Sequence, residues 1–481
     1  MTKTTKKGQT GLKRSNGLMA PLALSMGFLV FTASTLPAQD TITDALGGVY
    51  EGELDDGIRH GIGTYRLENG YEYSGEWQNG VIAGEGIARF INGAVYQGNF
   101  AAGKPDGLGH ITFPDGSTYE GEWVAGVIQG IGKTVDTRGT FYEGSFENGE
   151  RHGQGTLRGI DGYSYEGGWD MGQRSGMAHI VFADGSTFEG LMAENRRNGP
   201  GSLISSDGMR YEGEWQNDQM HGAGVLSLPN GDIYDGGFDD GARHGAGLIR
   251  YANGDIYEGD FEMDQRHGTG TLTRTDGYRY EGDWFGGQIE GTGEVTYPDG
   301  AVYRGAFIDN VAHGQGDITY ASGAQYSGDW KDGVIEGEGS ATYASGAQYQ
   351  GQFVNALQEG QGRMSYPDGF NYEGAWRAGQ RTGEGVSAFP DGSLYRGEHL
   401  NGRLHGTGTF VAADGFRYEG SWVNGKINGE GQADYTNGDV YVGSFVEGQR
   451  EGQGTLTYAN GDRISGQWEN GALVGEAVDS N

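Results

Sequence analysis

Aromatic residues and glycines alternate with polar residues in short segments that recur along the chain. Tyr73, Gly75 and Trp77, for example, are separated by single polar residues. Successive side chains of a β-strand point to opposite faces, so this pattern predicts a strand with one aromatic and one polar face. The segment returns every 23 residues from Tyr50 onward without an insertion or deletion.

The repeat has nearly invariant positions. Glycine stands two and eleven residues after the tyrosine position in all nineteen repeats, and thirteen residues after it in 17 of 19. The position four residues after the tyrosine is Trp in nine repeats and Phe in seven, and these nine are all the tryptophans. The glycine content is therefore set by position, which excludes a low-complexity segment.

Each repeat predicts one β-hairpin. A turn follows the first strand, often with Asn-Gly at its centre, as at Asn79-Gly80, and this dipeptide tolerates the positive φ angles of a tight hairpin. In the returning strand we expect both glycines, such as Gly84 and Gly86, to face inward, where an aromatic ring can lie on the backbone. A second turn with Asp-Gly or Asn-Gly leads to the next tyrosine.

The predicted fold is all-β: an elongated, solenoid-like antiparallel β-ribbon of about 18 to 19 stacked hairpins. Such an array places function on a long surface and not in one pocket. The array spans residues 50–478, with a degenerate repeat at 188–210 and a truncated capping repeat at 464–478. A short linker at 39–49 precedes it, and 479–481 is a tail.

The consensus Tyr-Glu-Gly-Glu-Trp, present at 119–123, is followed in the repeat by Asn-Gly, His-Gly-x-Gly and Asp-Gly. This consensus closely resembles the MORN repeat, the membrane occupation and recognition nexus, and the chain resembles an exported bacterial protein of this type. The resemblance implies a twisted β-ribbon with a shallow groove. It also implies a role as a scaffold, a dimerisation platform or an attachment to membranes and partners.

The repeat positions predict a structural core of tyrosines, glycines and tryptophans and no catalytic residues. Its representative members are Tyr73, Gly75, Trp77, Gly84, Gly86, Tyr119, Gly121, Trp123, Tyr211, Gly213, Trp215, Tyr280, Gly282, Trp284, Tyr326, Gly328, Trp330, Tyr418, Gly420 and Trp422.

Three features depart from a uniform repeat. In the degenerate repeat, Met192 replaces the aromatic residue and Arg196 and Arg197 occupy the turn, which indicates either tolerated decay or a partner-specific patch. His399 is a smaller departure, at the tryptophan position. Position nine is mostly apolar in Trp repeats and often Arg in Phe repeats, which indicates alternating packing or alternating binding subsites.

Residues 1–38 predict a signal peptide or a membrane anchor. Basic residues precede an apolar run, and Ala38 precedes a candidate cleavage site. If the segment is retained, residues 18–36 would anchor the chain in an inner membrane, although the run is slightly short for a full span. Either alternative places the array in the periplasm, in the cell envelope or outside the cell. The chain has no cysteine, so it forms no disulfide.

The strong negative charge limits the partners. Removal of the five positive charges in residues 1–38 changes the formal net charge from −33 to −38. Such a surface repels nucleic acid and anionic lipid, so we expect membrane contact only through the N-terminal segment or a partner. The carboxylates either keep the sheet soluble and unpaired or recruit cations such as Ca²⁺.

Neither a resident metal nor a cofactor is expected. Seven of the ten histidines share one repeat position, but equivalent residues in adjacent hairpins lie roughly 10 Å apart, too far to converge on one ion. The acidic residues recur in every hairpin without singling out a catalytic pair, and neither a phosphate-binding loop nor a nucleophile elbow is present.

The sequence predicts a non-enzymatic scaffold of the cell envelope that binds proteins, including a second copy of itself. A glycan-binding array is the second interpretation and a lipid-associated protein the third. Aromatic rings open to solvent would favour glycan, whereas a groove closed by hydrophobic side chains would favour a peptide or helix.

Overall fold

The computed structural model describes residues 40–478, which form 39 β-strands and no helix. The predicted signal peptide or anchor and the predicted tail lie outside these residues and stay predictions. Within the described range, no helix with the length and apolarity of a membrane span occurs. Every repeat contributes one shorter first strand and one longer second strand, as the hairpin pattern predicts.

The chain divides into two compact units, and the division runs through β8. The described part of the first unit comprises residues 40–116 and 122–127. Its strands β1 to β7 pair antiparallel in chain order. These strands and β8 are β1 Asp40–Thr43, β2 Val49–Asp55, β3 Ile58–Arg66, β4 Glu72–Gln78, β5 Val81–Arg89, β6 Val95–Ala101, β7 Lys104–Thr112 and β8 Thr118–Val124.

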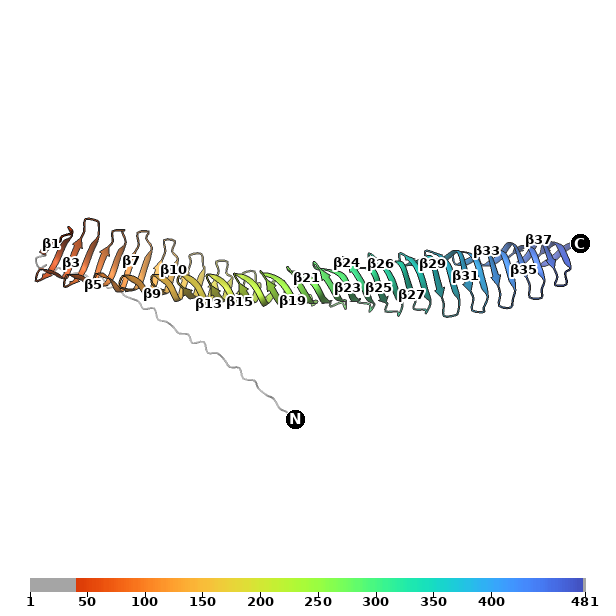
Figure 1. Ribbon diagram of the computed structural model, residues 1–481, viewed down its shortest axis with the longest axis horizontal. Coiled ribbons are helices and arrows are strands. Elements are labelled where there is room, and N and C mark those ends of the chain that lie inside the picture. The colour runs from red at the N-terminus through yellow and green to blue at the C-terminus, as the bar shows by residue number, and fades with distance from the viewer. Residues whose placement is uncertain (1–39, 479–481) are drawn as a thin grey trace, which may run out of the picture. The chain divides into compact units, whose positions relative to one another are not determined.

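The second unit comprises residues 117–121 and those from Ile128 onward. From β9 to β39 each strand pairs antiparallel with the next one in the chain, and Figure 1 shows these hairpins following one another. The strands are β9 Val127–Val135, β10 Phe141–Glu147, β11 Glu150–Arg158, β12 Ser164–Asp170, β13 Gln173–Val181, β14 Thr187–Ala193, β15 Arg196–Ile204, β16 Arg210–Gln216, β17 Gln219–Ser227, β18 Ile233–Asp239, β19 Ala242–Arg250, β20 Ile256–Glu262, β21 Gln265–Thr273, β22 Arg279–Phe285, β23 Gln288–Thr296, β24 Val302–Ile308, β25 Val311–Thr319, β26 Gln325–Lys331, β27 Val334–Thr342, β28 Gln348–Val354, β29 Leu357–Ser365, β30 Asn371–Arg377, β31 Gln380–Ala388, β32 Leu394–Leu400, β33 Arg403–Val411, β34 Arg417–Val423, β35 Lys426–Asp434, β36 Val440–Val446, β37 Gln449–Thr457, β38 Arg463–Glu469 and β39 Ala472–Val478.

The described part of the predicted linker 39–49, which begins at residue 40, contains a strand and a turn. β1 pairs antiparallel with β2, with Ile42 opposite Tyr50. In the turn after it, the Asp44 carboxylate accepts hydrogen bonds from Arg59 Nη2 at 2.8 Å and from the Tyr65 hydroxyl at 2.7 Å. The prediction was wrong here because a strand added at a sheet edge is held by its backbone and needs no repeat pattern in its side chains.

The register of the hairpins places two glycines directly opposite each other. In β4 and β5, Gly75 lies opposite Gly86, and Trp77 lies opposite Ile82, with a bulge between the two pairs. Gly84 lies in this bulge, with φ of +73°. We expected Gly84 to face a ring, and this was wrong. The bulge turns its backbone into the left-handed region, where glycine avoids strain.

Tyrosine rings cover the glycine pairs and form the core. A Cβ atom built on Gly86 would lie 2.4 Å from the Tyr73 hydroxyl oxygen, so only glycine fits under the ring. That hydroxyl donates a hydrogen bond to the carbonyl oxygen of Glu76, 2.9 Å away. Tyr73 also meets Trp77 of its own hairpin at 5.5 Å and Phe100 of the next at 5.0 Å between centroids, both edge to face. Such contacts are favourable for aromatic quadrupoles, and their repetition builds a ladder of rings.

The Asn-Gly turn has the predicted geometry. Asn79 and Gly80 have φ of +51° and +80°, as a type I′ hairpin requires. The Gly80 amide donates a hydrogen bond to the carbonyl oxygen of Arg59 in the preceding hairpin, 2.8 Å away. The tips of successive hairpins are therefore joined by backbone hydrogen bonds.

Candidate interaction surface

The predicted core residues lie on the aromatic face of the sheet and are closed to ligands. No tryptophan in the chain has more than 8% of its surface exposed. The predicted tyrosines, which are Tyr73, Tyr119, Tyr211, Tyr280, Tyr326 and Tyr418, are at most 3% exposed. Burial also raises the pKa of the Tyr211 hydroxyl to about 12. The aromatic ladder therefore holds the fold together and presents no row of open rings.

Arginines at position nine cover the ladder. Arg266 lies 4.2 Å above the Trp284 ring, and Arg450 lies 4.2 Å above the Trp468 ring. In each case the ring belongs to the next hairpin. Cation–π contacts of this kind stabilise neighbouring hairpins against each other, so the alternation at this position is one of packing.

The three residues of the predicted patch in the degenerate repeat do not form a common surface. Met192 is 4% exposed, because it occupies the core position of the missing aromatic ring. Arg197 lies 4.1 Å above the Trp215 ring, and its Nε is 3.1 Å from the Asp218 carboxylate. Arg196 alone is exposed. The patch prediction was wrong for Met192 and Arg197, whose side chains face the ladder.

The histidines and carboxylates are distributed along the sheet. His152 Nε2 lies 3.3 Å from a Glu147 oxygen, and His267 Nε2 lies 3.3 Å from a Glu262 oxygen. Within residues 40–478, no group of three His, Asp or Glu side chains is placed to hold a metal ion. The acidic surface therefore contains no assembled Ca²⁺ site in the described part of the chain.

Apolar side chains form an exposed row beside the hairpin turns of the second unit. They stand five and eight residues after the tyrosine, where the two strands of a hairpin meet, and pair across it as Ile308 with Val311 and Val354 with Leu357. Each is 40–62% exposed. This hairpin-edge row consists of Phe285, Ile308, Val311, Val334, Val354, Leu357, Leu400, Val423 and Val446.

The fold does not require apolar residues in these positions. In the repeats between residues 142 and 279 the equivalent positions are mostly acidic or amide side chains. They include Glu147, Glu150, Asp170, Gln173, Gln216, Gln219, Asp239, Glu262 and Gln265. The row is interrupted at Arg377 and Gln380, and exposed apolar residues also stand at these positions before residue 142, as at Val81 and Val127. Exposed apolar side chains that recur from hairpin to hairpin are typical of a protein-binding surface. The row was not predicted from the sequence, because positions five and eight flank a turn and the alternation within the strands assigns them no role.

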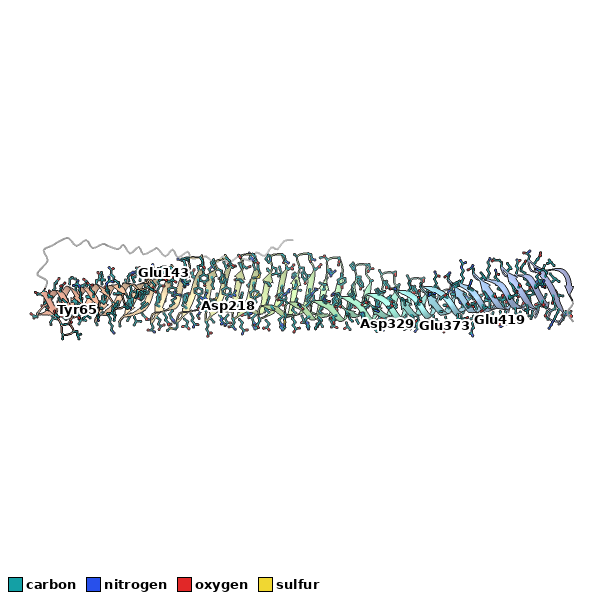
Figure 2. All side chains as sticks on the ribbon, turned by 90° about the horizontal axis from the view of Figure 1, so that it is seen from above. Tyr65, Glu143, Asp218, Asp329, Glu373 and Glu419 are labelled. Carbon is teal, nitrogen blue, oxygen red and sulfur yellow. The ribbon has the colours of Figure 1, made fainter. Side chains whose placement is uncertain are left out.

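Carboxylates flank the hairpin-edge row on the same face of the sheet. Odd positions of the first strand share one face, so Glu281 and Asp283 lie on the face of Phe285, and Glu419 on that of Val423. Glu281 and Glu419 have exposed side chains, and Figure 2 shows Glu419 among the side chains of this unit. Arg279 and Arg417 pair with these two glutamates, and Lys331 and Lys426 stand at positions five and eight. The surface therefore combines apolar contact with charges of both signs.

The 23-residue repeats of this chain match a known family. A family model described as MORN repeat matches eighteen consecutive segments, and the chain belongs to the MORN-repeat family. The matched residues are 50–70, 73–95, 96–118, 119–141, 142–162, 165–187, 188–210, 211–233, 234–256, 257–277, 280–302, 303–325, 326–348, 349–370, 372–394, 395–417, 418–440 and 441–463. The degenerate repeat is among them. No curated protein matches the chain significantly.

Solved structures give only a weak likeness. The TCP10 domain of Danio rerio CPAP is 15% identical with a TM-score of 0.25, covering 41% of this chain and 93% of that one. The SAS-4 (dCPAP) TCP domain of Drosophila melanogaster, solved with a proline-rich motif of Ana2 (dSTIL), is 13% identical with a TM-score of 0.21. It covers 42% of this chain and 90% of that one. Scores this low carry no argument about this chain.

Proposed function

We propose that this protein is a non-enzymatic MORN-repeat scaffold that binds protein partners along the hairpin-edge row. The observation that carries the proposal is the exposure of nine apolar side chains, each at least 40% exposed, at positions that the repeats between residues 142 and 279 fill mostly with acidic or amide side chains. Exposed apolar area costs free energy in water, roughly 25 cal/mol per Å², and a partner that covers the row removes that cost.

The chemistry of the row indicates the kind of partner. Apolar side chains beside charges of both signs are complementary to a partner surface with apolar side chains next to charged ones. Opposite charges would speed association and fix the orientation, while apolar contacts would supply most of the affinity. A long array repeats this surface in successive hairpins, which suits a helix or an extended segment.

Burial of the tryptophans favours protein over glycan as the ligand. Glycan recognition by stacking needs ring faces open to solvent, and these indoles are covered by their neighbours. The net charge of −33 also disfavours direct binding to anionic lipid. Glycan and lipid therefore remain the second and third interpretations.

We further propose that the scaffold is exported and works in the cell envelope, with residues 1–38 as its signal peptide or anchor. Cell fractionation with mass spectrometry of the N-terminus tests this proposal. A mature N-terminus near Gln39 in the periplasm supports cleavage, and an intact N-terminus in the inner membrane supports an anchor. Recovery from the cytoplasm alone would overturn export.

Affinity capture with paired variants tests the binding surface. The variant Val354→Lys/Leu357→Lys places charges in the row, and Gln216→Lys/Gln219→Lys places the same charges at equivalent positions outside it. A partner captured by wild-type protein should be lost with the first variant and kept with the second. Equal capture by both would exclude the row as the docking surface. Sedimentation of the purified protein shows whether that partner is a second copy.

A further inference from the structure

The ladder of aromatic rings is interrupted once in the second unit by a polar pair. His399 stands at the tryptophan position and is 3% exposed, and Ser387, at a position that is commonly aliphatic, is fully buried. The Ser387 Oγ and His399 Nε2 atoms are 3.0 Å apart. The imidazole packs edge to face between Tyr372 and Tyr395, with centroid distances of 4.9 and 5.2 Å.

The hydrogen bonds of His399 identify its tautomer. His399 Nδ1 lies 3.0 Å from the carbonyl oxygen of Gly397, which can only accept, so Nδ1 carries the proton. Nε2 then accepts from the Ser387 hydroxyl. The ring is neutral, and burial lowers its pKa to about 4.

A cavity of about 560 Å³ lies beside this interruption. Ser387 contributes to its wall, and three phenylalanines and one tryptophan from four successive repeats supply most of the apolar surface. Its main lining residues are Phe370, Phe389, Phe410, Trp422, Arg381 and Leu404. Aromatic walls with one or two polar groups are typical of small-molecule binding sites.

Arg381 supplies an unusual charge to this cavity. Five other arginines of position nine stack on a tryptophan of the next hairpin, with distances from 4.1 to 5.2 Å. In the next hairpin after Arg381 that tryptophan is replaced by His399, and the guanidinium lies 4.9 Å above Phe370. Arg381 thus has no indole of the next hairpin beneath it, and its guanidinium lines the cavity instead.

The same guanidinium lacks a carboxylate partner. Arg197 and Arg243 each pair with an aspartate 21 residues later, but the corresponding residue for Arg381 is Gly402, whose carbonyl oxygen accepts from its Nη2 at 2.6 Å. Arg403 also lines the cavity. In the described part of the chain, neither arginine has a carboxylate within ion-pairing distance. Two arginines without an ion pair to a carboxylate therefore line one cavity.

We propose that this cavity binds a ligand in which an aromatic ring is joined to a carboxylate. The ring packs against Phe389 and Phe410, and the carboxylate accepts hydrogen bonds from Arg381 at the side vacated by the missing indole. Charge-assisted bonds to a partly buried guanidinium are stronger than bonds between neutral groups. The ligand is either a free arylalkanoate or the C-terminal aromatic residue of a peptide.

Calorimetric titration of the full chain with N-acetyl-L-phenylalanine tests the site. We expect saturable binding, at least a tenfold loss with Arg381→Gln, and no change with Arg266→Gln, an arginine of the same repeat position that stacks on Trp284. The amide of the same compound, which lacks the carboxylate, should bind at least tenfold more weakly than the acid. Equal binding of acid and amide, or no saturable binding of the acid to wild-type protein, would overturn the proposal.

A second variant controls for the possibility that Arg381→Gln loses binding because it misfolds. His399→Trp restores the repeat consensus, so it should fold at least as well as the wild type while its indole fills the space beside Arg381. We expect this variant to lose binding with unchanged circular dichroism, and retained binding would place the ligand elsewhere. Peptides ending in phenylalanine, with free or amidated C-termini, distinguish the sources: tighter binding of the free-acid peptide than of N-acetylphenylalanine identifies a chain terminus.

Discussion

The indole nitrogen of Trp284 donates a hydrogen bond to the carbonyl oxygen of Gly270, 3.1 Å away in the preceding hairpin. Eight tryptophans make the same bond to a glycine fourteen residues earlier, and phenylalanine in the other repeats cannot. Tryptophan therefore joins hairpins by a polar bond as well as by ring contact, whereas phenylalanine joins them by ring contact alone.

We predict that Trp284→Phe weakens the local stability of β21 to β23 by about 1 kcal/mol, because one buried hydrogen bond is lost while the ring contact is kept. Hydrogen exchange of peptides from residues 265–296, monitored by mass spectrometry, measures this change. Phe285→Gln, at the neighbouring exposed position, serves as the control and should change exchange much less. A loss of protection no larger than in the control would contradict a stabilising role of the indole bond.

We predict that Gly293→Ala destabilises its hairpin by roughly 3 kcal/mol or more, because the new methyl group would lie 2.6 Å from a Tyr280 ring carbon. The ring would have to leave the glycine pair and disturb its contact with Trp284. Gly185→Ala is the control, since φ there is +87° but no atom lies within 4 Å of the added methyl. That control should cost about 1 kcal/mol through backbone strain alone.

Comparison of the two variants by local hydrogen exchange separates crowding from strain. Equal losses of protection at the two sites would show that the ring can move aside and that glycine under the tyrosine is not required. Ala178 occupies the equivalent position in one repeat. The requirement for glycine at this position can therefore be met by alanine when the neighbouring residues adapt. The prediction therefore applies to a repeat whose neighbours have not changed.

The repeat was enough to predict the hairpins, their turns and the burial of the ladder, since each depends on neighbours at fixed separation. The role of Gly84 was not predicted, because a bulge shifts the register by an amount that alternation does not specify. β1 was missed because backbone pairing at an edge has no side-chain signature. The position of Arg381 over Phe370 was also not predicted, because the repeat pattern does not specify which ring a guanidinium contacts where His399 replaces the tryptophan.

We predict a pH dependence of local stability at His399. Its pKa is lowered to about 4 by burial and by the positive charge of Arg381, whereas the imidazole of the unfolded chain has a pKa of about 6.5. Between these values the unfolded state binds a proton that the folded state does not. Stability therefore falls as pH decreases through this window, by up to about 3 kcal/mol, and is unaffected above it.

His399→Phe isolates this effect, because phenylalanine occupies the same position in seven other repeats and does not titrate. Hydrogen exchange in residues 394–411, corrected for the intrinsic rate, should rise from pH 7 to pH 5 more in the wild type than in the variant. Carboxylates are common to both proteins, so their titration cancels in the difference. The same pH slope in both proteins would show that the imidazole does not control local opening.

We predict that the array resists alkaline ionisation and then opens as its tyrosines titrate. Burial raises the pKa of Tyr142, Tyr234 and Tyr441 to about 12 in the folded chain, against about 10 in unfolded protein. The stability that these groups contribute is fully present below pH 10 and is lost as pH rises toward 12, because only the unfolded state releases the protons there. Tyrosinate absorbance of the native chain should therefore lag behind that of the chain in denaturant. At higher pH, the tyrosinate absorbance of the native chain should rise together with the loss of β-structure in circular dichroism. Ionisation of the tyrosines near pH 10 with circular dichroism unchanged would mean that the hydroxyls are accessible to solvent and that the rings are not closed by their neighbours.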